Sequence, residues 1–127
     1  MRIEAERLIK QAERDLVNAG KNVDIGAYEV AAFLAEQAVE KCLKAAWMVV
    51  KGEAAPRTHS LTELADALGV PPERRRPFVY LTADYMTTRY PDAANGIPYE
   101  IYDEETARSK VAAAEEAFEW LRALTNA

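Results

Sequence analysis

The longest apolar helical pattern in this chain lies between residues 26 and 50, and it constrains the fold more than any other feature. Two rows of apolar side chains recur there every three or four residues, which is the spacing of a helix face. The first row is Tyr28, Ala31, Ala35, Ala38, Cys42, Ala45 and Val49, and the second is Ala32, Val39, Leu43, Ala46 and Val50. A helix with so wide an apolar surface must lie at the centre of a bundle, or it must also face a second copy of the protein. We expect residues 28–50 to carry more apolar surface than the neighbours within one copy cover, which by itself predicts a homodimer.

Four further helices are predicted from the same periodicity and from their end signals. They cover about residues 2–22, 61–68, 77–89 and 104–124. In the helix over residues 77–89, Thr82, Tyr85 and Arg89 are successive neighbours along one edge. Ser60 and Glu63 form a capping-box pattern, and Asp24 and Asp103 are expected N-caps of the helices that follow them. Gly52 and Gly69 are expected helix stops, while residues 51–58 and 91–102 are expected to be a linker and a loop.

These elements predict an all-α fold, an up-down antiparallel helical bundle with one short connector helix. The 127 residues form a single domain, residues 1–127, with 50% hydrophobic and 29% charged side chains, a composition that folds. Cys42 is the one cysteine, so an internal disulfide is excluded. Residues 1–18 are charged throughout and the apolar runs are too short to cross a membrane, so we expect a cytoplasmic protein without membrane contact.

The net charge and the absence of known motifs exclude several classes of binding and catalytic site. A net charge of −5 argues against loose, charge-driven binding of nucleic acid, and the run Arg74 to Arg76 is read as a solvated turn. The sequence has no Gly-rich phosphate loop, no Cys-x-x-Cys and no His-Glu-x-x-His, so neither a metal nor a cofactor is expected. Glu36 and Glu40 are candidates for acid–base work, although Glu40 and Lys44 are also spaced for a helical ion pair.

Three blocks of sequence carry a resemblance to a known family. They are A-E-Q-A-V-E-K-C-L-K-A at residues 35–45, H-S-L-x-x-L at residues 59–64, and R-Y-P-D at residues 89–92. In this order and spacing, the chain resembles the HEPN domain over nearly its whole length. The resemblance implies an all-α bundle that forms a homodimer and acts beside a minimal nucleotidyltransferase, often as a toxin–antitoxin pair.

The resemblance also implies a site. Many HEPN proteins are metal-independent endoribonucleases with an Arg, four to six residues and then a His, and the two motifs meet across the dimer. Here Arg89 is present, but the positions for His hold Ala94, Asn95 and Gly96. None of these three residues serves as a general base near neutral pH. Arg89 is therefore carried over as a phosphate-binding residue, and catalysis is not carried over.

The candidate residues for binding a nucleotide or RNA are Arg89, Tyr90, Asp92 and Asn95, with His59, Lys41 and Lys44 as secondary candidates. Two of these candidates have a structural alternative: Arg89 closes a helix and pairs with Asp92 or with a helix-end carbonyl, and His59 hydrogen-bonds the linker. Two alternative functions stay open beside the binding module, an endoribonuclease toxin with an altered active site and a purely structural helical adaptor.

Overall fold

The computed structural model describes residues 2–126, and within that range every regular element is a helix. The long helices are α1 (Arg2–Asp24), α2 (Tyr28–Lys51) and α8 (Glu104–Thr125). Shorter elements lie between α2 and α8: α3 (Leu61–Leu68), the 3₁₀ turn η1 (Pro72–Arg74), α4 (Arg76–Leu81), α5 (Asp84–Thr87), α6 (Pro91–Ala94) and α7 (Pro98–Ile101). The predicted all-α class is confirmed.

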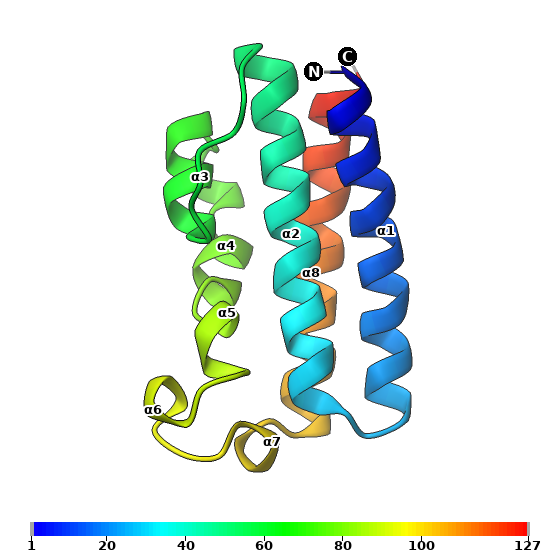
Figure 1. Cartoon of the computed structure of the whole chain (residues 1–127), viewed down its shortest axis with the longest axis vertical. Helices are drawn as coiled ribbons and strands as arrows, with labels where there is room; N and C mark the ends of the chain where they lie inside the picture. The colour runs from blue at the N-terminus through cyan, green and yellow to red at the C-terminus, as the bar shows by residue number, and fades with distance from the viewer. Residues whose placement is uncertain (1, 127) are drawn as a thin grey trace.

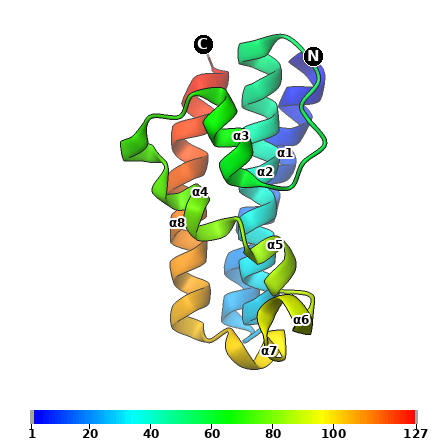
Figure 2. The same ribbon diagram turned by 90° about the vertical axis from the view of Figure 1, so that its left-hand side faces the viewer.

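The helices form an up-down bundle in which α2 lies at the centre (Figure 1). Helix α1 runs down, α2 returns upward, α3 to α5 descend together, and α8 runs upward again, so both ends of the chain lie at the same end of the bundle. Helix α2 packs against α1 and α8, and on another side against α3 and α5. Figure 2 shows that the short helices α3, α4 and α5 follow one another along the bundle and together form its third helical segment, with α6 and α7 at the lower end.

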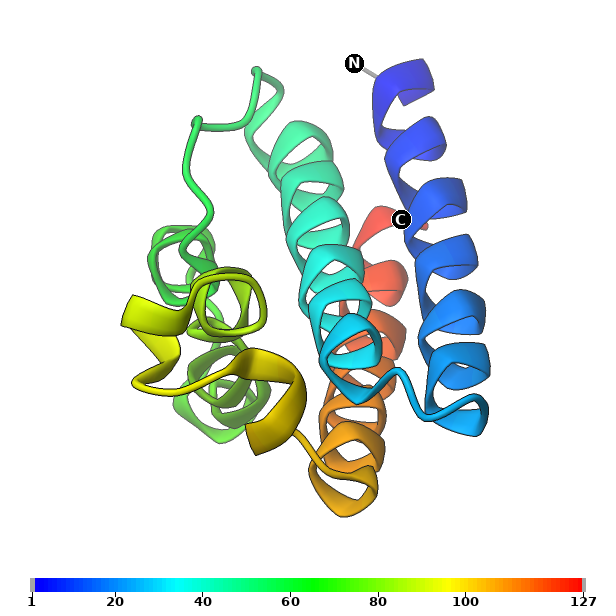
Figure 3. The same ribbon diagram turned by 60° about the horizontal axis from the view of Figure 1, so that its bottom comes forward.

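The apolar surface of α2 is covered within the chain. Most residues of both apolar rows are fully buried, whereas Val30 and Val50 are 40% and 54% exposed. Seen from below, α2 is surrounded by α1, by α8 and by the third segment made of α3 to α5 (Figure 3). The helix is therefore central, the first of the two arrangements that its pattern allowed. The expectation that one copy cannot cover this surface was wrong, because most of both rows is buried by neighbouring helices of the same chain. The homodimer stays a prediction.

The predicted helix ends are confirmed at four places. Gly52 and Gly69 close α2 and α3 in the left-handed conformation that glycine adopts most readily. Ser60 Oγ accepts from the backbone N–H of Glu63, and Asp103 accepts from the N–H of Thr106. The other half of the predicted capping box is not formed, because the N–H of Ser60 donates to Thr58 Oγ1. The prediction for Asp24 was wrong. Asp24 is the last residue of α1, and α2 begins at Tyr28 without a side-chain cap.

Two predicted segments differ in detail. The helix expected over residues 77–89 is interrupted at Thr82 and Ala83, which separates α4 from α5. Thr82 Oγ1 accepts the backbone N–H of Leu61, so this side chain caps the start of α3. The loop expected over residues 91–102 contains two single-turn helices, α6 and α7, each with a proline in its first turn, where the missing N–H is not needed.

Within residues 2–126, no helix has both the length and the apolar character needed to cross a membrane.

Candidate functional site

Arg89 follows α5 and lies among aromatic rings. Its Nε donates a hydrogen bond to the backbone oxygen of Tyr85 at 2.7 Å, which is the helix-end carbonyl contact expected as a structural alternative. Its Cζ lies 4.2 Å from the ring centroid of Tyr85, 4.9 Å from that of Tyr90 and 5.3 Å from that of Phe33. These distances are those of cation–π contacts, which hold a guanidinium without neutralising it.

The guanidinium of Arg89 has no carboxylate partner among the described residues, because every ion pair within 4.0 Å there joins other groups. The expected alternative pairing with Asp92 is therefore not formed. Arg89 is exposed, and a guanidinium in this state presents N–H donors that match the oxygens of a phosphate.

His59 lies on the other face of Tyr85. The two rings are stacked, with centroids 4.0 Å apart and planes inclined by 13°. Because Arg89 also lies over this ring at contact distance, His59 and Arg89 must occupy opposite faces of Tyr85. His59 Nδ1 is 3.0 Å from Glu40 Oε1, so the ring is held by α2. The expectation that His59 hydrogen-bonds the linker was wrong.

Of the α2 residues that the sequence singled out, Glu40 and Lys44 contact each other, and Lys41 contacts a different helix. Glu40 is buried and contacts both His59 and Lys44, whose Nζ lies 3.3 Å from Glu40 Oε2. The predicted Glu40–Lys44 ion pair is thus confirmed, and it connects Lys44 to the site through Glu40. Lys41 points elsewhere, because its Nζ is 2.7 Å from Asp15 Oδ2 on α1.

Tyr90, Asp92 and Asn95 lie beside or beyond Arg89 on exposed backbone. Tyr90 is the extended N-cap residue of α6, and Asp92 is in the first turn of that helix. Asn95 is the C-cap of α6 and has a positive φ of 54°, the left-handed conformation that asparagine tolerates better than most residues. Of these three side chains, only Tyr90 has a contact to Arg89 in the structure.

A second polar cluster, here called the buried cluster, lies under α5 and consists of Glu36, Asp84, Tyr102 and Lys110. The Tyr102 hydroxyl is 2.5 Å from Asp84 Oδ1, and Lys110 Nζ is 2.8 Å from Asp84 Oδ2. Lys110 Nζ also donates to the backbone oxygen of Tyr80 at 2.6 Å. These contacts join α5, α7 and α8, so they fix the segment that carries Tyr85 and Arg89.

Glu36 is the least satisfied member of the buried cluster. Its side chain is fully buried, Gln37 Nε2 donates to its Oε1 at 2.8 Å, and its Oε2 has no hydrogen-bond partner. Burial raises the pKa of Glu36 to about 8, and the charges of Glu40 and Asp84 act in the same direction, whereas the Gln37 hydrogen bond and the charge of Lys41 oppose them. A carboxyl in this state is kept neutral by its surroundings near neutral pH.

Sequence reasoning placed Tyr85 and Arg89 on one helix edge, and the structure confirms that they are in contact. It missed Phe33 and three members of the buried cluster, Asp84, Tyr102 and Lys110, whereas Glu36 had been named as a candidate for acid–base work. The sequence signal for Phe33 was that it widens the apolar surface of the helix predicted over residues 26–50 beyond its two rows. Asp84, Tyr102 and Lys110 showed no shared local pattern, because they come from three separate parts of the chain.

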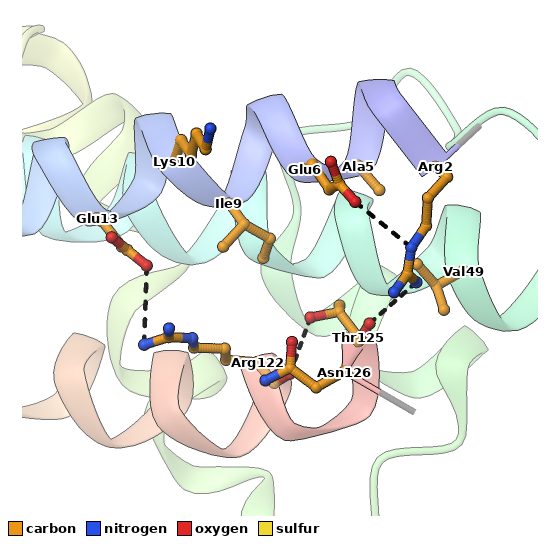
Figure 4. A pocket seen from close by; sticks show the side chains of 10 residues that line it. All are labelled: Arg2, Ala5, Glu6, Ile9, Lys10, Glu13, Val49, Arg122, Thr125 and Asn126. Carbon is orange, nitrogen blue, oxygen red and sulfur yellow. Dashed lines mark hydrogen bonds and ion pairs between the residues drawn. The ribbon is translucent and has the colours of Figure 1, made fainter.

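Another cleft lies between the first turns of α1 and the last turns of α8 (Figure 4). Both of its arginines have partners within the chain, whereas Lys10 forms no ion pair among the described residues. Arg2 contacts Glu6 at 3.6 Å and the backbone oxygen of Thr125 at 3.1 Å, and Arg122 contacts Glu13 at 3.7 Å. Because these cations already have partners in the chain, the cleft offers less to an anion than Arg89 does.

No cluster of three or more His, Cys, Asp or Glu side chains arranged to hold a metal ion occurs among residues 2–126. Cys42 is buried without a disulfide, and burial raises the pKa of its thiol to about 12, so it stays an inert thiol.

Comparison with known proteins addresses the family. A search of the curated proteins found no match. Among solved structures, TT1696 from Thermus thermophilus is 28% identical with a TM-score of 0.87, covering 95% of this chain and 98% of that one. ST0689, an archaeal HEPN homologue, is 35% identical with a TM-score of 0.80, covering 94% and 96%. The family model described as HEPN domain matches residues 5–124, and the chain therefore belongs to the HEPN domain family.

Proposed function

We propose that this chain is the HEPN partner of a minimal nucleotidyltransferase in a toxin–antitoxin-like module, that it works as a homodimer, and that Arg89 binds the phosphate of a nucleotide or RNA. Family membership supports the general role. The single observation that carries the phosphate role is the guanidinium of Arg89, which is exposed, has no carboxylate partner among residues 2–126, and is held in place by aromatic rings.

The geometry around Arg89 favours binding for two reasons. The hydrogen bond from Nε to the Tyr85 backbone limits the motion of the side chain, so less entropy is lost when a ligand binds. The terminal nitrogens keep donors available to an anion, since their one hydrogen bond within the described residues is a weak one of 3.8 Å from Nη2 to the sulfur of Met86.

The proposal is for binding rather than cleavage, because residues 94–96 supply no histidine in the family motif. Tyr90 belongs to the same proposed site through its contact with Arg89. Asp92 and Asn95 remain neighbours that shape the exposed side of the site. Lys44 supports His59 through Glu40, and Lys41 is engaged on the α1 side and is left out of the proposed site.

The phosphate role is tested by measuring the affinity of ATP and of a single-stranded RNA oligonucleotide for wild type, Arg89→Ala and Arg89→Lys. We expect Arg89→Ala to lower affinity about tenfold or more, because a charge-assisted contact is lost. Arg89→Lys should restore part of the loss, since it keeps the charge without the bidentate fork. Arg7→Ala removes an exposed arginine of α1 and is the matched control. Equal affinities for wild type and Arg89→Ala would refute the phosphate role.

The assembly is tested separately. Co-expression with a minimal nucleotidyltransferase encoded beside this chain should yield a complex that survives purification. Light scattering coupled to size exclusion should give the mass of two chains for the protein alone. A single-chain mass at high concentration would overturn the homodimer, and a nucleotidyltransferase that never co-purifies would overturn the partnership.

A further inference from the structure

Four carboxyl side chains are buried within residues 2–126, and they differ in whether a cation accompanies them. Three have a lysine partner: Asp84 with Lys110 at 2.8 Å, Glu40 with Lys44 at 3.3 Å, and Asp15 with Lys41 at 2.7 Å. Glu36 is the fourth. It is fully buried, and no ion pair within 4.0 Å in the described part of the chain includes it. An ionised Glu36 is therefore a buried charge without a partner, which is strongly unfavourable.

On its own helix and towards α1, Glu36 faces one cation that is already engaged. Gln37 donates to Oε1 of Glu36, and Oε2 has no hydrogen-bond partner among the described residues. Glu40, one turn further along α2, adds negative charge. The charge of Lys41 acts in the opposite direction, but Asp15 of α1 holds its ammonium at 2.7 Å. Neither side therefore compensates an ionised carboxylate at this position.

Towards α5 and α8, Glu36 faces the other members of the buried cluster, whose charges balance without it. Asp84 of α5 adds negative charge. Lys110 of α8 and the hydroxyl of Tyr102, which follows α7, each bind an oxygen of Asp84. His59, just before α3, binds the next glutamate of α2 instead. When Glu36 is protonated, one carboxylate is matched by one ammonium, and when it is ionised, two carboxylates share that ammonium.

The helix α5, which packs against α2, is short and is fixed by few buried polar contacts. It has four residues, Thr82 and Ala83 separate it from α4, and α6 and α7 beyond it are also single turns. A helix this short is not stable by itself and depends on tertiary contacts. Its buried polar contacts pass through Asp84 and through Thr87, whose hydroxyl is 2.6 Å from that of Tyr102. Negative charge on α2 therefore acts on the residue that anchors α5.

We propose that the segment formed by α5, α6 and α7 (residues 84–101) is a pH-sensitive switch: a proton on Glu36 keeps it packed against α2, and loss of that proton to water opens it while α1, α2 and α8 stay together. Opening relieves the unfavourable charge in two ways, because it moves Asp84 away and lets water hydrate the carboxylate of Glu36. The three long helices keep the apolar contacts that bury α2, so they stay packed when the short segment opens.

The pH range of the switch follows from the two states of Glu36. In the closed segment, burial raises its pKa to about 8, and the charges of Glu40 and Asp84 act in the same direction. In the open segment the carboxyl is hydrated and its pKa returns to the ordinary value of 4.5. Because the closed form has the higher pKa, the closed segment is favoured in full below about pH 4.5. Its advantage falls up to about tenfold per pH unit between 4.5 and 8, and levels off above 8, where both forms are ionised.

The switch acts on the part of the chain that carries Arg89, which lies between α5 and α6 and is bound to the backbone of Tyr85. Opening of the segment therefore changes the surroundings of the proposed phosphate site. The switch itself does not depend on that phosphate role, because it is tested on the protein without any ligand.

Hydrogen exchange of the backbone amides, measured at several pH values between about 5 and 8 and corrected for the intrinsic exchange rate, tests the switch. In wild type, the protection of residues 84–101 should fall with rising pH, by several-fold up to about tenfold per pH unit, because one proton is linked to opening. Amides of α2 and α8 should be better protected than this segment at every pH, because their exchange requires the long helices to unfold.

The variants show whether the proton on Glu36 is responsible. Glu36→Gln and Glu36→Met both place a neutral side chain of similar length at this position, so the protection of residues 84–101 should stay constant with pH. The second variant carries the test if the buried amide of the first prevents folding. Glu119→Gln, at an exposed position of α8, is the matched control and should follow the pH course of wild type.

Two results would overturn the proposal. One is a protection of residues 84–101 equal to that of α2 at every pH, since opening is then the global unfolding of the chain. The other is a pH course shared by wild type and the neutral Glu36 variants, since opening is then independent of this proton. Neither result changes the standing of the proposed phosphate role of Arg89, which is measured by affinity.

Discussion

Asp84 and Tyr85 are consecutive residues of α5, yet they belong to polar clusters of opposite character. Asp84 is in the buried cluster, where the tyrosine hydroxyl and the lysine ammonium approach its two oxygens. Tyr85 belongs to an exposed cluster with His59 and Arg89, in which the cation Arg89 is held by aromatic rings and a backbone oxygen. Charges with fixed partners inside the chain hold its fold, whereas an exposed cation without one is available to a ligand.

The largest effect on stability is expected when the buried cation Lys110 is removed. Lys110→Met should lower the free energy of unfolding by about 3–5 kcal/mol, because it leaves the Asp84 carboxylate buried without its partner. Urea denaturation measures the change. Arg108→Met removes an exposed cation of the same helix, which pairs with Glu104, and should cost far less. If both variants lose the same free energy of unfolding, the contact of Lys110 with Asp84 does not stabilise the fold more than an exposed ion pair does.

Glu36 gives the next largest effect, and it depends on pH. Its folded-state pKa of about 8 lies above its ordinary value of 4.5, so folding favours the protonated form. The sign follows from linkage: the native state is penalised as pH rises from about 4.5 towards 8, by up to about 1.4 kcal/mol per pH unit. Glu36→Gln removes this penalty, so the variant should gain stability over wild type progressively across that window.

The Glu36 prediction is checked by urea denaturation at several pH values between about 4.5 and 8. At the acid end of that window the two proteins should differ little, since the native side chains are then both neutral. Glu119→Gln, at an exposed position of α8, is the charge-matched control. A difference between Glu36→Gln and wild type that stays constant with pH would contradict the neutral buried carboxyl.

Tyr102→Phe should have a smaller effect, a loss of about 1–3 kcal/mol in the free energy of unfolding. The hydroxyl contacts both Asp84 and the hydroxyl of Thr87, and burial followed by the Asp84 contact raises the pKa of Tyr102. Tyr99→Phe removes a hydroxyl from an exposed tyrosine of α7 and serves as the control in the same thermal and urea melts. If both variants unfold alike, the Tyr102 contacts do not stabilise α7 against α5.

The two clusters also differ in how far the sequence predicted them. Helical spacing placed Tyr85 and Arg89 on one edge, and local rules located the caps at Ser60 and Asp103, because these interactions join residues three or four apart. The break at Thr82 was not predicted, since its cause is a contact with Leu61, 21 residues away.

The buried cluster shows the same limit more clearly. Glu36, Asp84 and Lys110 lie on α2, α5 and α8, and no repeating spacing connects them. Their proximity depends on how the helices pack, which a one-dimensional pattern does not encode. The stack of His59 on Tyr85 and the contact of His59 with Glu40 likewise arise only when the linker, α2 and α5 are brought together.

Arg89→Ala should have the smallest effect on stability, which is what makes it informative. The side chain is exposed, and its contacts are one hydrogen bond to a backbone oxygen and cation–π contacts near solvent, so the free energy of unfolding should fall by about 1 kcal/mol or less. Binding of the single-stranded RNA should fall about tenfold or more in the same preparation. If Arg89→Ala lost as much stability as Lys110→Met and bound RNA like wild type, the role of Arg89 would be to stabilise the fold. The contrast between the buried contacts of Asp84 and the exposed contacts of Tyr85 would then no longer hold.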